Sequence, residues 1–379
     1  MRVRLAELIA SETHGVSYKT LKYGLDASDS PNSYEVSAVW EKSAESSHKP
    51  KYIDLQPLRK NLALSSEQIF TFFLDGSRKV FKVDEIAYGL SGGRRAVYPI
   101  IAGQIITGIC RRENRKMIPE THKYEIVLSL PETADYDNNA KRGFWQGLAQ
   151  KLSGCLRDSG LEISDVLSYK TGRDSRNTSF EDRATATIQT RMLETEKHLT
   201  EYLTRKKLLN HRNYLIKDGS LEYRQKSGIP FQNYRWVIGL SKSFNPEACM
   251  NIHGKADPGY IADLPVNHRT QAACFSYPEF LGEAHFAVWY IRLHDRKNTR
   301  SAFDGIVKAE KLLVTHDETA SQSVNSDEID TLSAYILNER YPVCYGSDSR
   351  WTSHIYPVYL TEQYIKSKYI SAESFMHLF

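Results

Sequence analysis

Two stretches of the sequence place an aspartate directly after a run of apolar residues, and both continue as Asp-Gly-Ser. The acids are Asp75, which follows Phe73-Leu74, and Asp218, which follows Leu215-Ile216-Lys217. An acid at the carboxyl end of a buried strand faces the crevice in which α/β sheets bind ligands. Two such acids on neighbouring strands would suit Mg²⁺ or Mn²⁺. Asp-Gly is also ordinary turn chemistry, and Asp304-Gly305, which follows no apolar run, is interpreted as a turn.

A third acid, Glu196, is predicted on a long helix over residues 181–207. The apolar positions of this helix recur at helical spacing: Ile188, Met192, Leu199 and Leu203. Glu196 falls beside this stripe, where a carboxylate is costly unless it is paired or binds a metal. The simpler alternative is a glutamate at the rim of the core that pairs with Arg191 or Lys197.

Carboxylates on two strands and a helix are typical of two-metal phosphoryl-transfer sites, in which the cations activate water and stabilise the leaving oxygen. His354 and Glu362 lie near the predicted C-terminal helix and could complete such a site or move a proton. A purely structural role is the alternative for each.

Strands and helices that could position these acids are predicted from the apolar pattern. An aromatic-rich run over 69–74 reads as a buried strand that ends at Asp75-Gly76-Ser77. Further strands are expected at 94–110, 124–130, 213–217, 235–240 and 285–293, and further helices at 140–156 and 356–368. Three successive strands indicate an antiparallel meander, and residues 158–180 are polar and rich in Gly, Ser and Asp. The order predicts an α/β fold built on a mixed sheet.

The composition is that of a globular protein. The chain has 379 residues, of which 41% are hydrophobic and 25% charged, which excludes collagen-like and largely disordered classes. An N-terminal extension over 1–60 and a main domain over 61–379 are expected. The five cysteines are scattered, so neither disulfides nor a zinc site is supported. No membrane-spanning segment or signal peptide is evident, and a cytoplasmic location is expected.

Basic residues could bind the phosphates of a nucleic acid. The formal net charge of +4 permits such a partner without requiring one. The candidates are Arg94, Arg95, Arg111, Arg112 and Lys242. Solvated loops are the alternative for the clusters. The sequence contains no phosphate-binding P-loop, no dinucleotide fingerprint and no serine-hydrolase elbow, which disfavours those activities.

Taken in order, these motifs resemble those of the NurA nuclease family. The resemblance rests on the two Asp-Gly-Ser strands, the helix segment from Met192 to Glu196, and the tail Tyr356-Pro357-Val358-Tyr359-Leu360. It implies an RNase H-like nuclease core and a manganese-dependent DNA end-processing nuclease with two ions per site. It also implies a homodimer that works with a hexameric HerA-type ATPase translocase, in DNA repair or defence against phage.

The resemblance assigns metal-ligand roles to Asp75, Glu196 and Asp218, and the role of the tail tyrosine to Tyr356. Glu194 takes the helix role if the register of the helix differs. The family tail carries a histidine eight residues after that tyrosine, where this chain has Tyr364. Either His354 or Glu362 replaces it, or the fourth ligand is missing.

Two other functions are consistent with the sequence. One is a DNA-binding or scaffolding subunit of a translocase complex that has no catalytic activity, which the altered tail favours and the retained acids oppose. The other is a phosphotransferase resembling sugar kinases, because such folds also place Asp-Gly at strand ends.

Overall fold

The computed structural model describes residues 4–25, 39–45, 50–65, 67–89, 93–135, 143–172, 178–221, 231–251, 253–276, 285–340 and 351–379. The strands are β1 (Val16–Ser17), β2 (Tyr23–Leu25), β3 (Val39–Ser43), β4 (Tyr52–Asp54), β5 (Phe70–Gly89), β6 (Arg95–Glu113), β7 (Lys116–Pro131), β8 (Asp165–Tyr169), β9 (Tyr214–Asp218), β10 (Val237–Ser241), β11 (His268–Thr270), β12 (Ala273–Ser276), β13 (His285–Arg292) and β14 (Ile306–Leu312). The α-helices are α1 (Leu5–Glu12), α2 (Gln56–Ser65), α3 (Phe144–Leu156), α4 (Phe180–Arg205), α5 (Pro258–Ala262), α6 (His316–Ser321), α7 (Ser326–Asn338), α8 (Tyr356–Lys366) and α9 (Ala372–Met376).

One mixed sheet connects these strands in the order β3-β12-β13-β14-β10-β9-β5-β6-β7-β8. Its centre, β7-β6-β5-β9-β10, has β6 antiparallel to both neighbours, whereas β9 and β10 run parallel to β5. This is the order and direction of an RNase H-like sheet, with α4 as the crossover between the meander and β9. The predicted α/β class and the antiparallel meander are therefore confirmed.

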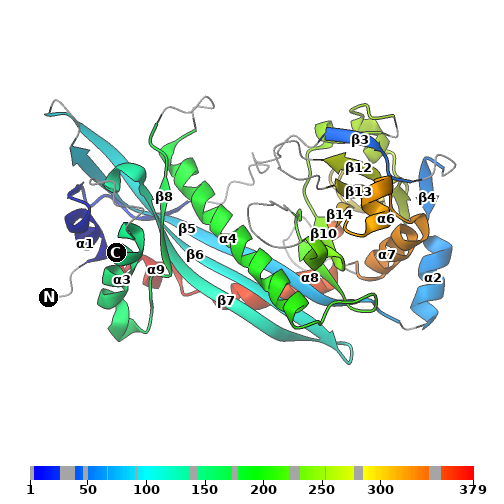
Figure 1. Cartoon of the computed structure of the whole chain (residues 1–379), viewed down its shortest axis with the longest axis horizontal. Helices are drawn as coiled ribbons and strands as arrows, with labels where there is room; N and C mark the ends of the chain where they lie inside the picture. The colour runs from blue at the N-terminus through cyan, green and yellow to red at the C-terminus, as the bar shows by residue number, and fades with distance from the viewer. Residues whose placement is uncertain are drawn as a thin grey trace.

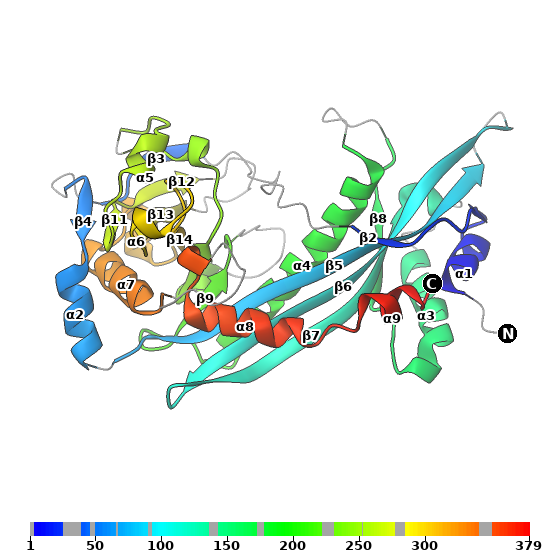
Figure 2. The same cartoon turned by 180° about the vertical axis from the view of Figure 1, so that it is seen from behind.

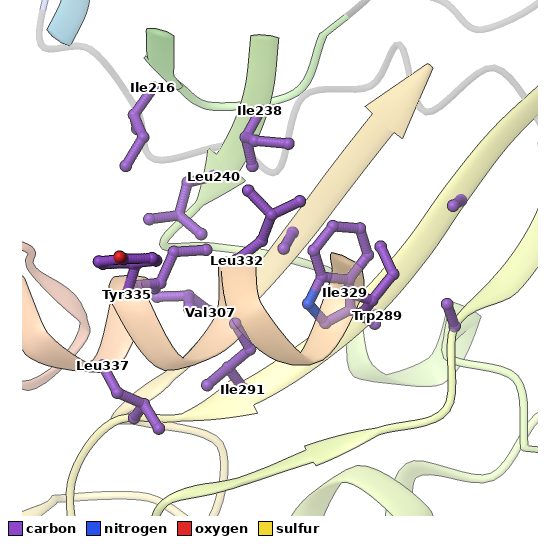
Figure 3. Packing of buried hydrophobic residues seen from close by; sticks show 14 of the residues in the cluster. Ile216, Ile238, Leu240, Trp289, Ile291, Val307, Ile329, Leu332, Tyr335 and Leu337 are labelled. Carbon is purple, nitrogen blue, oxygen red and sulfur yellow. The ribbon is translucent and has the colours of Figure 1, made fainter. Parts of the chain in front are cut away.

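Helices cover both faces of this centre. The amphipathic α4 packs along β5 and β6 on the face seen in Figure 1, and α8 packs on the same strands from behind, as Figure 2 shows. The apolar stripe of α4 is buried as predicted, with Ile188 and Leu203 fully enclosed. Farther along the sheet, Figure 3 shows the largest core cluster, where Leu332 and Tyr335 of α7 pack over Ile238 and Trp289 of the sheet.

The first Asp-Gly-Ser segment does not end its strand, contrary to expectation. β5 continues through Asp75 to Gly89, and Asp75 pairs with Gly108 of β6. The pairing explains the difference, because β6 supplies a continuous antiparallel partner beyond the acid. The second segment behaves as predicted: β9 ends at Asp218, and Gly219 has a φ of +85° that favours glycine. Asp304-Gly305 is a turn, as predicted, with a φ of +75° at Gly305.

Other predicted elements are present with shifted ends, and several elements were missed. β8 lies within the polar stretch 158–180, and neither it nor β14 and α7 were predicted. The described strands before residue 60 join the sheet: β1 and β2 pair with β5, β3 with β12, and β4 with β11. The domain boundary near residue 60 stays a prediction. None of the helices in the described ranges is long and apolar enough to span a membrane. Cys344 lies outside the described residues, and Cys110 and Cys155 are free thiols within them.

Candidate active site

The acid Asp75 lies at a gap in the hydrogen bonding of β5. On one side of β5, pairing with β9 stops at Leu74, and pairing with β2 begins at Val80. Between them, residues 75–79 are paired with β6 only, as far as the described chain shows. A cavity of about 550 Å³ opens at this edge. It is lined by Asp75, Gly76, Ser77, Arg78, Lys79, Met192, Asp218, Lys242, Glu362, Lys366 and Tyr369.

Three of the lining carboxylates gather around one lysine. Lys242 Nζ lies 2.8 Å from Asp218 Oδ2 and 3.7 Å from Glu362 Oε2, and Lys366 Nζ lies 2.5 Å from Glu362 Oε1. Asp75 is 6% exposed, and its Oδ1 accepts a hydrogen bond from the amide of Gly76. The structure thus brings together the predicted residues Asp75, Asp218, Glu362 and Lys242.

The ionisation of these groups reflects a shortage of positive charge. Burial, followed by the negative charge of Asp218, raises the pKa of Asp75 well above its usual range. Burial also opposes ionisation of Glu362, but the charges of Lys242 and Lys366 prevail and lower its pKa. For Lys242 the acids likewise outweigh burial and raise its pKa. Asp75 is therefore the carboxylate whose negative charge is least compensated.

Glu196 lies on the other side of β5. Adjacent residues of a strand face opposite sides of a sheet, so Gly76 faces away from Asp75 and toward α4. A Cβ on Gly76 would collide with Glu196 Oε1, which shows how closely this side chain approaches. Glu196 Oε2 lies 2.9 Å from Lys217 Nζ, a partner that the sequence did not predict. Glu194 is half-exposed beside Arg191, which leaves Glu196 as the better placed helix acid.

The remaining tail residues lie beside the cavity rather than in its wall. His354 is buried with its ring perpendicular to that of Tyr359, and it helps to lower the pKa of Glu362 after the two lysines. Tyr356 is 44% exposed and stacks on Tyr359. At the position where the tail lacks a histidine, the hydroxyl of Tyr364 is hydrogen-bonded to His122 of β7 at 3.0 Å.

Most of the predicted nucleic-acid contacts are elsewhere. Arg112 forms a two-pronged ion pair with Glu339, which is a structural contact between β6 and the end of α7. Arg111 is paired with Glu113 and Glu120.

Arg94 and Arg95 are exposed at the far end of the β5–β6 hairpin, where Arg95 pairs with Gly89. At about 3.3 Å per residue this is roughly 45 Å along β5 from Asp75. Lys242 alone of the five candidates lines the cavity.

Sequence reasoning missed four residues of the cavity wall: Arg78, Lys79, Lys366 and Tyr369. Arg78 and Lys79 follow the first Asp-Gly-Ser directly, but they were overlooked because the strand was expected to end there. Lys366 lies one helical turn after Glu362, a spacing at which opposite charges meet on a helix. That signal was available in the sequence.

The donor chemistry fits a divalent cation of the magnesium or manganese type. Within the described ranges, no three His, Cys, Asp or Glu side chains form a ready-made metal cage. Mg²⁺, however, is bound in many enzymes through one or two carboxylates, with water and substrate phosphates as the other ligands. Asp75 and Asp218 are such a pair beside an open cavity, and the charge of Asp75 is the less compensated of the two because Lys242 contacts Asp218 directly.

Comparisons with known proteins show only a distant likeness in structure. No family model matches the sequence, and no curated protein matches it. Among solved structures, the NurA nuclease from Sulfolobus solfataricus is similar with a TM-score of 0.39 and 10% sequence identity. The match covers 86% of this chain and 92% of that chain.

Proposed function

We propose that this chain is a metal-dependent deoxyribonuclease that hydrolyses phosphodiester bonds beside Asp75 and Asp218. The observation that carries the proposal is the position of this carboxylate pair. It lies where the parallel strand β9 ends beside β5, and it borders a cavity that is also lined by several basic side chains. Ligands of open α/β sheets bind at such carboxyl ends. Basic groups around the acids suit a polyanionic substrate.

Each residue has a role that follows from its surroundings. Asp75 and Asp218 would hold the cation, which when bound supplies an acidic water and stabilises charge on phosphate oxygens. Lys242 orients Asp218 through its 2.8 Å contact. Glu362 is ionised, because its pKa is lowered, and it is therefore suited to accept a proton.

The narrower form of the proposal rests on the motif resemblance. It is an end-processing nuclease that prefers Mn²⁺, binds two ions, forms a homodimer and acts with a HerA-type hexameric ATPase in DNA repair or anti-phage defence. The Asp75–Asp218 pair accounts for one ion. A second ion would need Glu196, which contacts Lys217 on the opposite side of β5.

The first test is cleavage of a labelled linear duplex and of its single strand, with Mn²⁺, with Mg²⁺ and with EDTA. We expect the wild type to cleave with metal and not with EDTA. Asp75→Asn should reduce the rate at least about 100-fold, because one anionic ligand is lost. The matched control is Asp304→Asn, which changes the acid of another Asp-Gly pair, in a turn outside the cavity wall. Cleavage by Asp75→Asn at the wild-type rate would contradict the assignment.

A second candidate function is favoured by the lysines. Lys242 and Lys217 already neutralise part of the charge of Asp218, Glu362 and Glu196. This arrangement would also suit a DNA-binding subunit without catalytic activity. Calorimetric titration with Mn²⁺ separates the two: a nuclease binds the ion and loses binding in Asp75→Asn, whereas a purely structural cluster binds none.

A further inference from the structure

Arg78 differs from the other cations in the wall of the cavity. Lys242 and Lys366 are each held by a carboxylate, and Lys79 Nζ lies 4.6 Å from the ring centre of Tyr369. The Arg78 guanidinium has no ion pair or hydrogen bond to any residue of the described ranges. Its Nε is buried there without a hydrogen-bond partner.

This arrangement is unfavourable for the isolated protein. An unsatisfied buried donor loses its bonds to water without replacement. Burial lowers the pKa of Arg78, and the charge effect that opposes burial comes from the hydroxyl of Tyr369 rather than from a carboxylate. A group that accepts hydrogen bonds and carries negative charge would remove the penalty. The planar guanidinium fork matches phosphate oxygens in two-pronged geometry, which lysine does not do.

We propose that Arg78 binds a phosphate of the nucleic-acid strand, next to the phosphodiester that is cut at Asp75 and Asp218. This inference rests on the proposed function and adds a residue that positions the substrate. Arg78 follows Asp75 by three residues, which corresponds to about 10 Å along β5. The phosphate that Arg78 binds is therefore a neighbour of the reacting one and not the reacting one itself.

Residues 75–79, where β5 has no partner on the side of β9 and β2, give the nucleic-acid strand a path across the sheet edge. Residues three apart in a strand face opposite sides, so Asp75 and Arg78 project to different faces of β5. Both still line one cavity. Residues 75–79 pair with β6 on one side only, and their other side is an edge that no described strand covers. A bound strand crosses this edge, with one phosphate at the acids and a later one at Arg78.

The test measures binding of a fluorescent 12-nucleotide single strand by anisotropy over a range of salt concentrations, in EDTA and again with Ca²⁺. We expect Arg78→Ala to weaken binding about tenfold and to lower the slope of log affinity against log salt by about one phosphate contact. Arg78→Lys should recover the salt slope but only part of the affinity. Arg296→Ala, which removes an exposed arginine outside the cavity wall, should change neither.

A second measurement locates the contact. Oligonucleotides that carry one uncharged methylphosphonate at successive positions should show a position at which the wild type loses affinity. Arg78→Ala should lose sensitivity at that position alone. Equal sensitivity of both proteins at every position would overturn the inference.

Two controls keep the outcomes separate. Thermal unfolding of Arg78→Ala and Arg78→Gln shows whether either variant is folded, and either one suffices for the binding series. If the wild type binds and cleaves DNA while Arg78→Ala binds with unchanged salt slope, only this inference fails. If the wild type neither binds nor cleaves DNA, the proposed function fails with it.

Discussion

At the scale of single residues, the site is defined by an imbalance of charge. Asp75 is buried near Asp218, Glu362 and Glu196, and Lys242 is the cation that most offsets their effect on it. Like charges in a buried site disfavour ionisation, so this carboxylate destabilises the folded chain when it is charged. Functional sites commonly carry such local instability.

This imbalance predicts that Asp75→Asn is more stable than the wild type near neutral pH. The pKa of Asp75 is higher in the folded than in the unfolded state, where it is about 3.9. Stability from protonated Asp75 is therefore present below that unfolded value and is lost as pH rises through the folded value. In EDTA we expect the melting temperature of Asp75→Asn to exceed the wild-type value by about 2 °C at pH 7.5.

The gain should disappear near pH 4, where the wild-type carboxyl is also protonated. Calorimetry at both pH values checks this, with Asp304→Asn as the control for the same chemical change in another Asp-Gly pair, outside the cavity wall. A lower melting temperature for Asp75→Asn at pH 7.5 would show that the carboxylate is stabilising.

At the scale of elements, the contact between β5 and α4 depends on a missing side chain. Gly76 lets Glu196 and Met192 approach the strand more closely than a Cβ would allow. Glu196 is in turn held against Lys217 of β9. The absence of a side chain at Gly76 thus lets α4 pack closely on β5, which carries Asp75. It also lets Glu196 of α4 contact Lys217 of β9, which carries Asp218.

We expect Gly76→Ala to reduce stability by about 1–2 kcal/mol, because the new methyl group displaces Glu196 from Lys217. Gly89→Ala is the matched control in the same strand, since a Cβ there meets nothing within 4 Å. Chemical denaturation of both variants measures the difference. Equal stabilities would mean that Glu196 adjusts without loss.

At the scale of the whole molecule, β5 spans the distance between the cavity and the end of a long hairpin. Its first residues pair with β9, and its later residues pair with β1 and β2. The hairpin of β5 and β6 extends past α3, as Figure 1 shows. Arg94 directly precedes β6, and Arg95 is its first residue, at that far end.

This separation predicts that the double variant Arg94→Ala/Arg95→Ala cleaves a 12-nucleotide single strand within twofold of the wild-type rate. Charges roughly 45 Å away are far beyond the screening length of about 8 Å at physiological salt.

Lys242→Ala should reduce the same rate at least about 100-fold, because Asp218 and Glu362 lose their shared counter-charge. Initial rates of the wild type, Lys242→Ala and the Arg94→Ala/Arg95→Ala double variant, measured side by side, check both predictions. A tenfold loss in the double variant would place the hairpin end on the substrate path.

The sequence by itself determined the elements whose pattern is strong and local. The meander, the amphipathic α4 and the apolar strands β9 and β10 follow from residue periodicity, which reflects which side of each element is buried. The second Asp-Gly-Ser was also predictable, because the chain turns locally at Gly219.

Only the tertiary structure decided where the first Asp-Gly-Ser lies and which groups surround it. β5 continues through Asp75 because β6, far along the chain, pairs with it, and no local pattern contains that information. The face that each acid occupies is equally non-local, since a shift of one residue moves a side chain to the other side of the sheet. That is why Asp75 is grouped with Lys242 and Glu362, while Glu196 lies behind Gly76 with Lys217.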